Sequence, residues 1–227
     1  GGKGAFIGDT HRIGAKITNM YEVVGGVFNR DFNTNMEFAK EYGLDESRIY
    51  HDVDELIEKE LALPEEERMT AVAIVTPNSS HFEIASKLVK NKFHIICDKP
   101  MTTTVAEAIE LERLVKENNV VFCLTHTYTG YPMVRQMREM IKSGILGEFQ
   151  RIDVQYYQGW VNDMLQGADG KINIWRMDPK YAGSSSCMAD IGVHGFNLIE
   201  YTTGLKIKSI LSDLNSLKAD IPLDLDG

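Results

Sequence analysis

The chain has 227 residues, of which 43% are hydrophobic and 25% are charged, and its formal net charge at pH 7 is −9. This size and composition suffice for one large or two small domains and argue against a disordered chain. The negative charge disfavours nucleic-acid or anionic-membrane binding, no apolar run approaches the length of a membrane span, and the first residues lack a signal-peptide pattern.

The first half of the sequence alternates between strand-like and helix-like segments. Apolar, β-branched runs predict strands at 21–28, 71–77, 94–100 and 120–126. Helical periodicity predicts helices at 34–43, 52–62, 81–91 and 104–119. The first of these helices has Asn33 or Thr34 as its expected cap and Gly43 as its expected end.

These expected strands are continuously apolar, which is typical of a parallel sheet covered by helices on both faces. Strands alternating with helices favour right-handed βαβ units and a doubly wound α/β fold of the Rossmann type. Ligands of such folds bind beyond the carboxyl ends of the strands. Lys99 follows such an end, so we expect it to point into a ligand crevice.

The second half has a different pattern. It predicts a helix at 131–147 that ends at Gly144, and a second helix at 184–204 that is capped by serine and ended by glycine. Alternation of polar and apolar residues predicts strands at 148–160 and 206–217. We therefore divide the chain into residues 1–126, a dinucleotide-binding domain whose first strand is missing, and residues 127–227, a partial α+β domain. We expect a fragment with both ends incomplete.

The three cysteines are Cys97, Cys123 and Cys187, and each lies in an apolar stretch. No two of them have the spacing of a metal site, and an odd number of buried cysteines indicates reduced thiols in the cytoplasm. We expect all three to be buried and to serve packing, and we expect no metal site.

The glycine cluster at residues 1–8 matches part of a dinucleotide-binding motif. Gly2 and Gly4 fit its first two glycines, while the third position falls on Ile7 with Gly8 one residue late. Glycines let the backbone approach a pyrophosphate, and the following helix offers its N-terminal amides. A flexible terminus is the alternative. The predicted cofactor contacts in this loop are Gly2, Gly4, Phe6 and Ile7.

Asn29 and Arg30 stand at the end of the expected strand 21–28, where the adenosine ribose would lie. An acid there would bind the ribose 2′-hydroxyl and favour NAD, whereas Asn29 and Arg30 leave room for the 2′-phosphate of NADP. Arg30 could equally be a solvated loop charge, so NAD and NADP both stay open. The turn after strand 71–77 either caps the next helix with Asn78 or Ser80 or lies along the cofactor, and its candidate contacts are Thr76, Pro77, Asn78 and His81.

Lys99 is the most distinctive single residue, because it stands beside Asp98 at the end of an apolar strand. A lysine held in a crevice can hydrogen-bond a substrate hydroxyl or help to move its proton. Pro100 fixes the backbone after it and can adopt the cis form. The alternative is an exposed lysine at a strand end, which is the commoner fate of lysine.

Asp190 and His194 are four residues apart, which on a helix places both on one face. A histidine oriented by a carboxylate is a competent general base. The alternatives are a structural Asp–His pair and a metal pair, for which no third ligand has suitable spacing. Gly192 and Gly195 are poor helix formers that allow close approach of a ligand, which favours a site.

Taken together, these segments resemble the Gfo/Idh/MocA family of NAD(P)-dependent oxidoreductases. The resemblance covers nearly the whole chain in order, through the glycine loop, "AVAIVTPNSSH", "HIICDKP", "THTYTGYPMVRQMREMIKSGILGE", "WRMDP" and "DIGVHGFNLIEY". It implies a Rossmann domain followed by an α+β domain with a predominantly antiparallel open sheet. It also implies a homo-oligomer, dimer or tetramer, that oxidises a secondary alcohol of a sugar, inositol or related polyol with NAD or NADP.

The resemblance also implies roles for single residues. It places Lys99, Asp190 and His194 around the substrate as catalytic residues, and it adds Asp98 and Lys99 to the cofactor contacts. The residues that would line the substrate and nicotinamide pocket are His126, Tyr128, Trp160, Trp175 and Arg176. Asp98 stands where the family usually has glutamate. The alternatives are a transient oxidation within an elimination or glycoside cleavage, and a non-catalytic nucleotide- or ligand-binding sensor.

Overall fold

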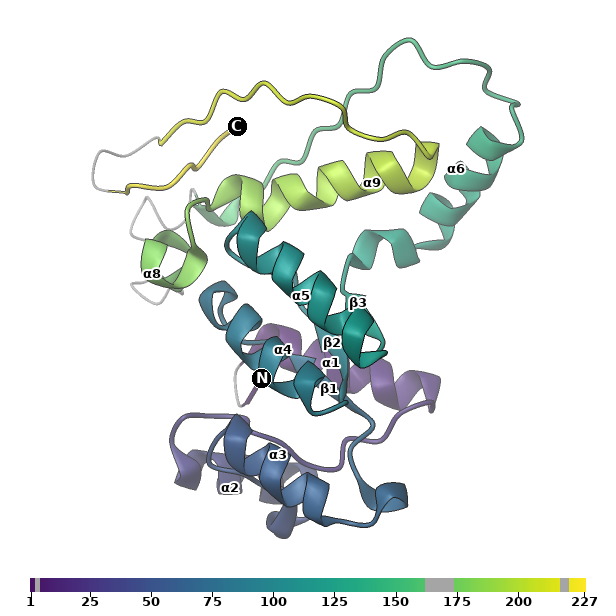
Figure 1. Ribbon diagram of the computed structural model, residues 1–227. Coiled ribbons are helices and arrows are strands. Elements are labelled where there is room, and N and C mark those ends of the chain that lie inside the picture. Colours follow the sequence, from purple (N-terminus) through teal and green to yellow (C-terminus); the bar gives the residue numbers. More distant parts are fainter. Residues whose placement is uncertain (3–4, 162–173, 217–220) are drawn as a thin grey trace. The chain divides into compact units, whose positions relative to one another are not determined.

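The computed structural model describes residues 1–2, 5–161, 174–216 and 221–227. The chain divides into two compact units. The first unit consists of Gly1–Thr76, Ser80–Asp98 and Ala106–Cys123. The second consists of Pro77–Ser79, Lys99–Val105 and Leu124–Gly227. Figure 1 shows the elements along the chain.

The first unit is built on a three-stranded sheet with the order β1-β2-β3. The strands are β1 (Ala71–Ile74), β2 (His94–Cys97) and β3 (Phe122–Leu124). β1 and β2 are parallel, with Ala71 opposite His94 and Ile74 opposite Cys97. The predicted parallel sheet of a Rossmann-type fold is therefore confirmed, with strands shorter than the apolar runs that predict them.

Five helices accompany this sheet (Figure 1). They are α1 (Phe6–Thr18), α2 (Phe32–Tyr42), α3 (Val53–Ala62), α4 (His81–Lys90) and α5 (Val105–Asn118). α4 links β1 to β2 and α5 links β2 to β3, which gives two consecutive βαβ units. Their packing against the sheet buries Leu88, Ile95 and Leu111 almost completely, and full burial of such a side chain contributes roughly 1.5–3 kcal/mol.

The helix ends follow local capping rules. α2 begins at Phe32, because the carboxylate of Asp31 accepts the N–H of Thr34 at 2.8 Å, so the expected caps Asn33 and Thr34 lie inside the helix. Gly43 ends α2 in the left-handed conformation with φ of +66°. For α2 the predicted start is thus accurate to two residues and the predicted end to one.

Residues 21–28 do not form the predicted strand. The segment makes only an isolated parallel bridge between Gly26 and Ile49, with the N–H of Gly26 donating to the carbonyl of Arg48 at 3.0 Å. A Cβ on Gly25 would lie 2.2 Å from that same carbonyl oxygen, so the two backbones approach closely there. Consecutive glycines permit this approach but weaken a strand.

The regular secondary structure of the second unit consists of helices in the described residues. Its elements include α6 (Pro132–Lys142), the short α8 (Pro179–Ala182), a π-helical turn (Met188–Gly192) and α9 (Val193–Thr203). α6 packs against α9 (Figure 1), and the guanidinium of Arg138 lies 4.4 Å from the ring centre of Tyr201. Gly204 ends α9 with φ of +74°, as predicted. α6 ends at Lys142, so Gly144 lies just beyond it.

The predicted strands at 148–160 and 206–217 are not formed among the described residues. No strand is assigned at 148–160, and in 206–216 only Asn215 pairs, in an antiparallel bridge with Asp226. Their alternating apolar side chains, such as Ile152 and Val154, are exposed. Alternation indicates a potential strand, but a strand also needs a neighbouring backbone.

The cysteines differ in burial. Cys97 is buried, Cys187 is partly buried and Cys123 is exposed, so the expectation that all three are buried is wrong for Cys123. Cys123 belongs to β3, where alternate side chains face outward. Burial raises the pKa of the Cys97 thiol to about 12. In the described part of the chain, no helix is long and apolar enough to cross a membrane.

Candidate functional site

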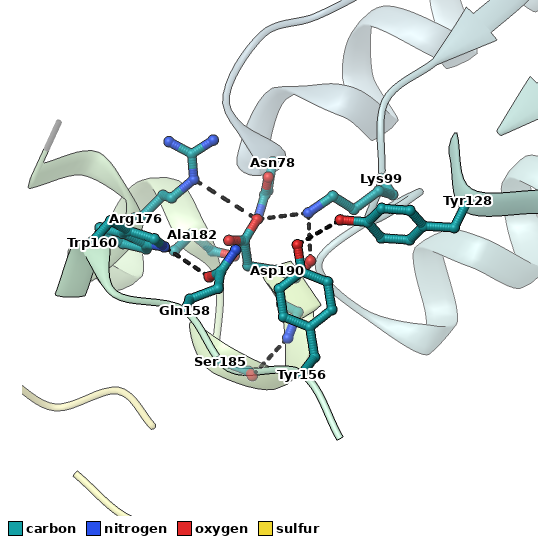
Figure 2. A network of polar contacts seen from close by, with 11 residues as sticks. Asn78, Lys99, Tyr128, Tyr156, Gln158, Trp160, Arg176, Ala182, Ser185 and Asp190 are labelled. Carbon is teal, nitrogen blue, oxygen red and sulfur yellow. Dashed lines mark hydrogen bonds and ion pairs between the residues drawn. The ribbon is translucent and has the colours of Figure 1, made fainter. Parts of the chain in front are cut away.

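The second unit holds an ion pair between Lys99 and Asp190 at the centre of a polar network (Figure 2). Nζ of Lys99 donates to Oδ1 of Asp190 and to the backbone carbonyl of Asp190, both at 2.6 Å. The two side chains are only 19% and 22% exposed. Two residues from separate motifs are thus brought into contact in a largely shielded place.

Local backbone geometry presents each partner of this pair. Lys99 is the second residue after the end of β2, and the Lys99–Pro100 peptide bond is cis. Asp190 lies in the π-helical turn that precedes α9. A Cβ on Gly192 would lie 2.6 Å from the side chain of Met188, so glycine lets Met188 fold over this turn. π-helical turns inside helices are frequent at functional sites.

His194 begins the next turn of the same helix and is 7% exposed. Its Nδ1 atom is buried and has no hydrogen-bond partner within the described residues. Burial, together with the positive charge of Lys99, lowers the pKa of His194 to about 4. The imidazole is therefore neutral at pH 7 and can accept a proton or a hydrogen bond.

The four-residue spacing of Asp190 and His194 does not produce the expected oriented pair. The carboxylate of Asp190 is engaged by Lys99, while Nδ1 of His194 has no partner among the described residues. The reason is the π-helical turn at Met188–Gly192, because a wider turn breaks the rule that four residues make one turn. Asp190 thus orients the lysine rather than the histidine.

Aromatic side chains surround His194. The ring of Tyr128 lies edge-on at 4.6 Å and that of His126 edge-on at 5.9 Å between centres. Nδ1 of His126 is also buried without a partner in the described part of the chain, and burial with the nearby Lys99 charge lowers the pKa of His126. Two neutral imidazoles with unused nitrogen atoms thus lie beside the Lys99 ammonium.

Other predicted pocket residues have definite partners. Arg176 lies with its guanidinium 4.5 Å from the ring centre of Trp175, and its Nε is 3.8 Å from Oδ1 of Asp190 (Figure 2). The indole N–H of Trp160 donates to Oε1 of Gln158 at 2.7 Å. Most of the loop between the two tryptophans, residues 162–173, lies outside the described residues.

Tyr156 is a site residue that the sequence does not reveal. Its hydroxyl lies 2.6 Å from that of Tyr128 (Figure 2), and burial, together with this contact, raises the pKa of Tyr128 to about 12. The two tyrosines come from segments far apart in the chain. The alternating pattern of 148–160 marks Tyr156 as a strand residue but carries no sign of this partner.

In the first unit, the glycine loop approaches other backbone closely. A Cβ on Gly2 would lie 2.6 Å from the carbonyl oxygen of Phe28, and one on Gly8 would lie 2.5 Å from that of Gly1. Gly4 lies outside the described residues. Phe6 and Ile7 open α1, where Phe6 is largely exposed. Glycine is therefore required at positions 2 and 8 for this close packing of the loop, which precedes the N-terminus of α1.

The segment at Asn29 and Arg30 is fixed by Asn35, a fully buried residue that the prediction overlooks. Oδ1 of Asn35 accepts the N–H groups of Phe28 and Asn29 at 2.6 and 2.7 Å. Its amide donates to the carbonyl of Tyr50 at 3.1 Å. Arg30 is exposed. A signal for Asn35 did exist, because it shares the buried face of α2 with Phe38 and Ala39 three and four residues on.

The other predicted cofactor residues lie at the strand ends. Nε2 of His81 is 2.8 Å from the carbonyl oxygen of Thr76, and the N–H of Asp98 donates to the carbonyl of Ile74 at 3.0 Å. Nε2 of His11, which the prediction also overlooks, lies 3.2 Å from Oδ1 of Asp98. This contact ties α1 to the end of β2.

Pro77 and Asn78 belong to the second unit. Asn78 is buried and donates its amide to the carbonyl of Ala182 at 3.0 Å (Figure 2), rather than capping α4. Ser80 precedes α4 without a side-chain cap bond, so neither expected cap serves that role. Within the described residues, no group of three or more His, Cys, Asp and Glu side chains could hold a metal ion.

The βαβ sheet, preceded by a glycine loop and a helix, has the architecture of the Rossmann class of dinucleotide-binding proteins. Residues 2–126 match the family described as "Oxidoreductase family, NAD-binding Rossmann fold", and residues 134–226 match the "GFO/IDH/MocA C-terminal domain". The chain therefore belongs to the GFO/IDH/MocA family of oxidoreductases, as its motifs predict.

Similar proteins support this assignment. The chain is 30% identical over 218 residues to an uncharacterized oxidoreductase, YfiI, of Bacillus subtilis, covering 95% of the chain and 55% of that protein. It is similar to the crystal structure of an inositol dehydrogenase homolog from Azotobacter vinelandii complexed with NAD+, with 32% identity, a TM-score of 0.84 and coverage of 89% and 51%. A structure from the same organism, complexed with NADH and myo-inositol, gives 30% identity, a TM-score of 0.80 and coverage of 89% and 50%. The chain thus spans about half the length of these relatives.

Proposed function

We propose that the protein transfers a hydride between NAD or NADP and a secondary alcohol of a sugar, inositol or related polyol. The observation that carries this proposal is the Lys99–Asp190 ion pair beside the buried, neutral imidazole of His194. A fixed ammonium next to an unused proton acceptor is what oxidation of a hydroxyl group requires. The family and the myo-inositol complex of a relative support the same chemistry.

The first unit offers residues that fit a dinucleotide. The glycine loop that contains Gly2 would lie along the pyrophosphate, with the N-terminus of α1 behind it. Asn29 and Arg30 would meet the adenosine ribose and decide between NAD and NADP. The other predicted contacts remain part of this proposal: Gly4, Phe6, Ile7, Thr76, Pro77, Asn78, His81, Asp98 and Lys99. When bound, the nicotinamide takes up the carbinol hydrogen as a hydride.

Three side chains would act on the substrate hydroxyl. Nδ1 of His194 would accept the hydroxyl proton, since that atom has no other partner in the described residues. Burial and the charge of Lys99 lower the pKa of His194, so its imidazole is unprotonated and available for this proton at pH 7. The ammonium of Lys99 would stabilise the developing alkoxide, and Asp190 would hold that ammonium in place.

The substrate body would lie against the remaining second-unit residues. Neutral His126 and the Tyr128–Tyr156 pair offer hydrogen-bonding groups close to His194. The arginine–tryptophan stack offers a flat polar edge of the kind that suits a hydroxylated ring. The proposed substrate contacts are His126, Tyr128, Trp160, Trp175 and Arg176.

We also place the full protein in the cytoplasm as a homo-oligomer. The three cysteines are free, which suits a reducing compartment. Large apolar side chains of α6, including Met133 and Met137, are exposed, which suits association with further protein surface.

The test is turnover of a panel of polyols and sugars by the full-length protein with NAD and with NADP. Lys99→Met and His194→Gln should each lower kcat/KM at least about 100-fold, since each removes charge stabilisation or proton transfer. Lys59→Met, at an exposed lysine of α3, serves as the matched control. Oxidation at the wild-type rate in either site variant would contradict the assignment. Product formed without net reduced cofactor would instead indicate a transient oxidation.

A further inference from the structure

Asp224 makes an unusual set of contacts for a residue near the end of the described chain. It is only 8% exposed. Its Oδ1 accepts the N–H of Ser186 at 2.8 Å, and its Oδ2 accepts the N–H of Met188 at 2.8 Å and the hydroxyl of Ser185 at 3.1 Å. Its backbone carbonyl accepts the N–H of Cys187 at 3.0 Å. One residue thus satisfies three consecutive amides.

These amides open the helical turn that carries Asp190. The hydroxyl oxygen of Ser185 accepts the next N–H, that of Ala189, at 3.1 Å. The N–H of Asp190 then donates to the carbonyl of Ser186 at 2.8 Å, which is the first bond within the turn. A helix start leaves four amides without internal partners, and a carboxylate there is favoured by both hydrogen bonding and the helix dipole. Asp224 therefore caps this turn from a distant segment.

The contact with Lys99 makes the path of this backbone matter. The ammonium donates to the carboxylate of Asp190 and also to its main-chain carbonyl. A shift of the turn would move both acceptors together, and a side-chain rotation could not restore them. The position of the ammonium thus depends on how the amides before Asp190 are held.

We propose that Asp224 is a positioning residue that holds Asp190 against Lys99. It touches neither substrate nor reacting atoms, and it acts through the backbone of residues 186–190. A test of this role by enzyme activity rests on the proposed function, whereas a test by chemical labelling of Lys99 does not. The alternative is that Asp224 only holds residues 221–227 against the rest of the second unit.

The experiment compares Asp224→Asn with Asp226→Asn in the full-length protein. Both substitutions remove one negative charge from the same segment, but Asp226 is exposed and its carboxylate makes none of these contacts. The side-chain oxygen of asparagine can still accept one of these backbone N–H groups. Its NH2 group is itself a donor, so it would face the other N–H group without forming a hydrogen bond. The first readout is the rate at which an acylating reagent modifies Lys99, followed by mass spectrometry. The second is the kcat and KM of polyol oxidation, with the cofactor Kd measured separately.

Asp224→Asn should speed the modification of Lys99 and lower kcat about tenfold or more, with the cofactor Kd unchanged. Asp226→Asn should leave the labelling rate, kcat and the cofactor Kd at their wild-type values. In an Asp190→Asn background the Asp224 substitution should raise labelling by a smaller factor than in the wild type, because Lys99 has already lost its ion pair and keeps only neutral acceptors. Unchanged labelling of Lys99 in Asp224→Asn would overturn the proposal, as would an equal effect of the two single substitutions. A wild-type protein that oxidises no polyol would refute the proposed function alone, since labelling still decides the role of Asp224.

Discussion

At the scale of single residues, His194 has the environment with the clearest chemical consequence. Its imidazole is buried, lies near the Lys99 ammonium and faces the ring of His126, and each of these disfavours a positive charge. The nearby Asp190 opposes them with a smaller effect, because its own carboxylate is paired. Folding therefore has to keep this histidine neutral.

This environment predicts how stability depends on pH. The pKa of His194 is 6.5 for an unperturbed side chain and about 4 in the folded protein. Between these values the unfolded chain binds a proton that the folded chain does not, so the free energy of unfolding should fall as pH decreases through that window. Urea unfolding of the wild type and of His194→Gln at several pH values checks this. The variant should lose less stability on acidification, whereas parallel curves would contradict the lowered pKa.

The sequence identifies these residues better than it identifies their partners. The motifs and the family resemblance predict Lys99, Asp190 and His194 together as site residues, and the structure places Lys99 in contact with Asp190. The partner of Asp190 is not predictable, because it depends on a π-helical turn that the hydrophobic periodicity of the sequence does not indicate. Residues that act across distant segments, such as Tyr156 and Asp224, have no local signature at all.

At the scale of secondary-structure elements, the buried Glu60 links three segments of the first unit. Its carboxylate, with a fully buried side chain, accepts bonds from both Nε and a terminal nitrogen of Arg48, from the hydroxyl of Tyr50 and from the N–H of Met69. Burial alone would raise the pKa of Glu60, but these bonds outweigh it and lower that pKa. Glu60 lies on α3, so the cluster fixes that helix to the chain before and after it.

Breaking this cluster should cost stability without touching the candidate site. We expect Glu60→Gln to lower the free energy of unfolding by about 3 kcal/mol, because it leaves the Arg48 charge without its buried partner. Glu58→Gln, at an exposed position of the same helix, should change it by less than about 0.5 kcal/mol. Urea denaturation measures both. Equal losses in the two variants would show that the cluster contributes nothing specific.

Elements differ in how well local sequence determines them. α2 and α3 are predictable to one or two residues because Asp31, Asp52 and Gly43 act within a single turn, whereas the helix predicted at 184–204 begins only with the π-helical turn at Met188–Gly192. Strands are harder, since a strand exists only where a neighbour supplies hydrogen bonds. β1 and β2 have that neighbour in each other, whereas residues 148–160 keep the alternating pattern without one in the described part of the chain.

At the scale of the whole molecule, both units leave large apolar side chains exposed, which in the first unit include Phe6 and Ile17 of α1. The first unit buries a continuous core around its sheet. In the second unit, Tyr157 is 86% exposed and Leu211 is fully exposed, both on extended segments. Extended segments with exposed apolar side chains and unpaired backbone groups favour association with other chains.

We therefore expect the 227-residue chain to self-associate in solution. The double substitution Tyr157→Glu and Leu211→Glu should lower the average mass measured by light scattering at a fixed protein concentration, because charge opposes strand pairing. The double substitution Lys16→Gln and Lys59→Gln, at exposed positions of the first unit, changes the net charge by the same two units and provides the control. A mass that is unchanged by the first pair, or lowered equally by the second, would contradict the role of these segments.

The bonding of Lys99 has a stereochemical consequence. An ammonium group carries three N–H bonds, and Asp190 accepts two of those of Lys99. One N–H is left for a substrate, so Lys99 can donate a hydrogen bond to a single substrate oxygen and cannot bridge two neighbouring hydroxyl groups. Such an enzyme would discriminate strongly between the two configurations of the carbon that bears this oxygen. Epimers that differ elsewhere around the ring would have to be told apart by the other walls of the pocket.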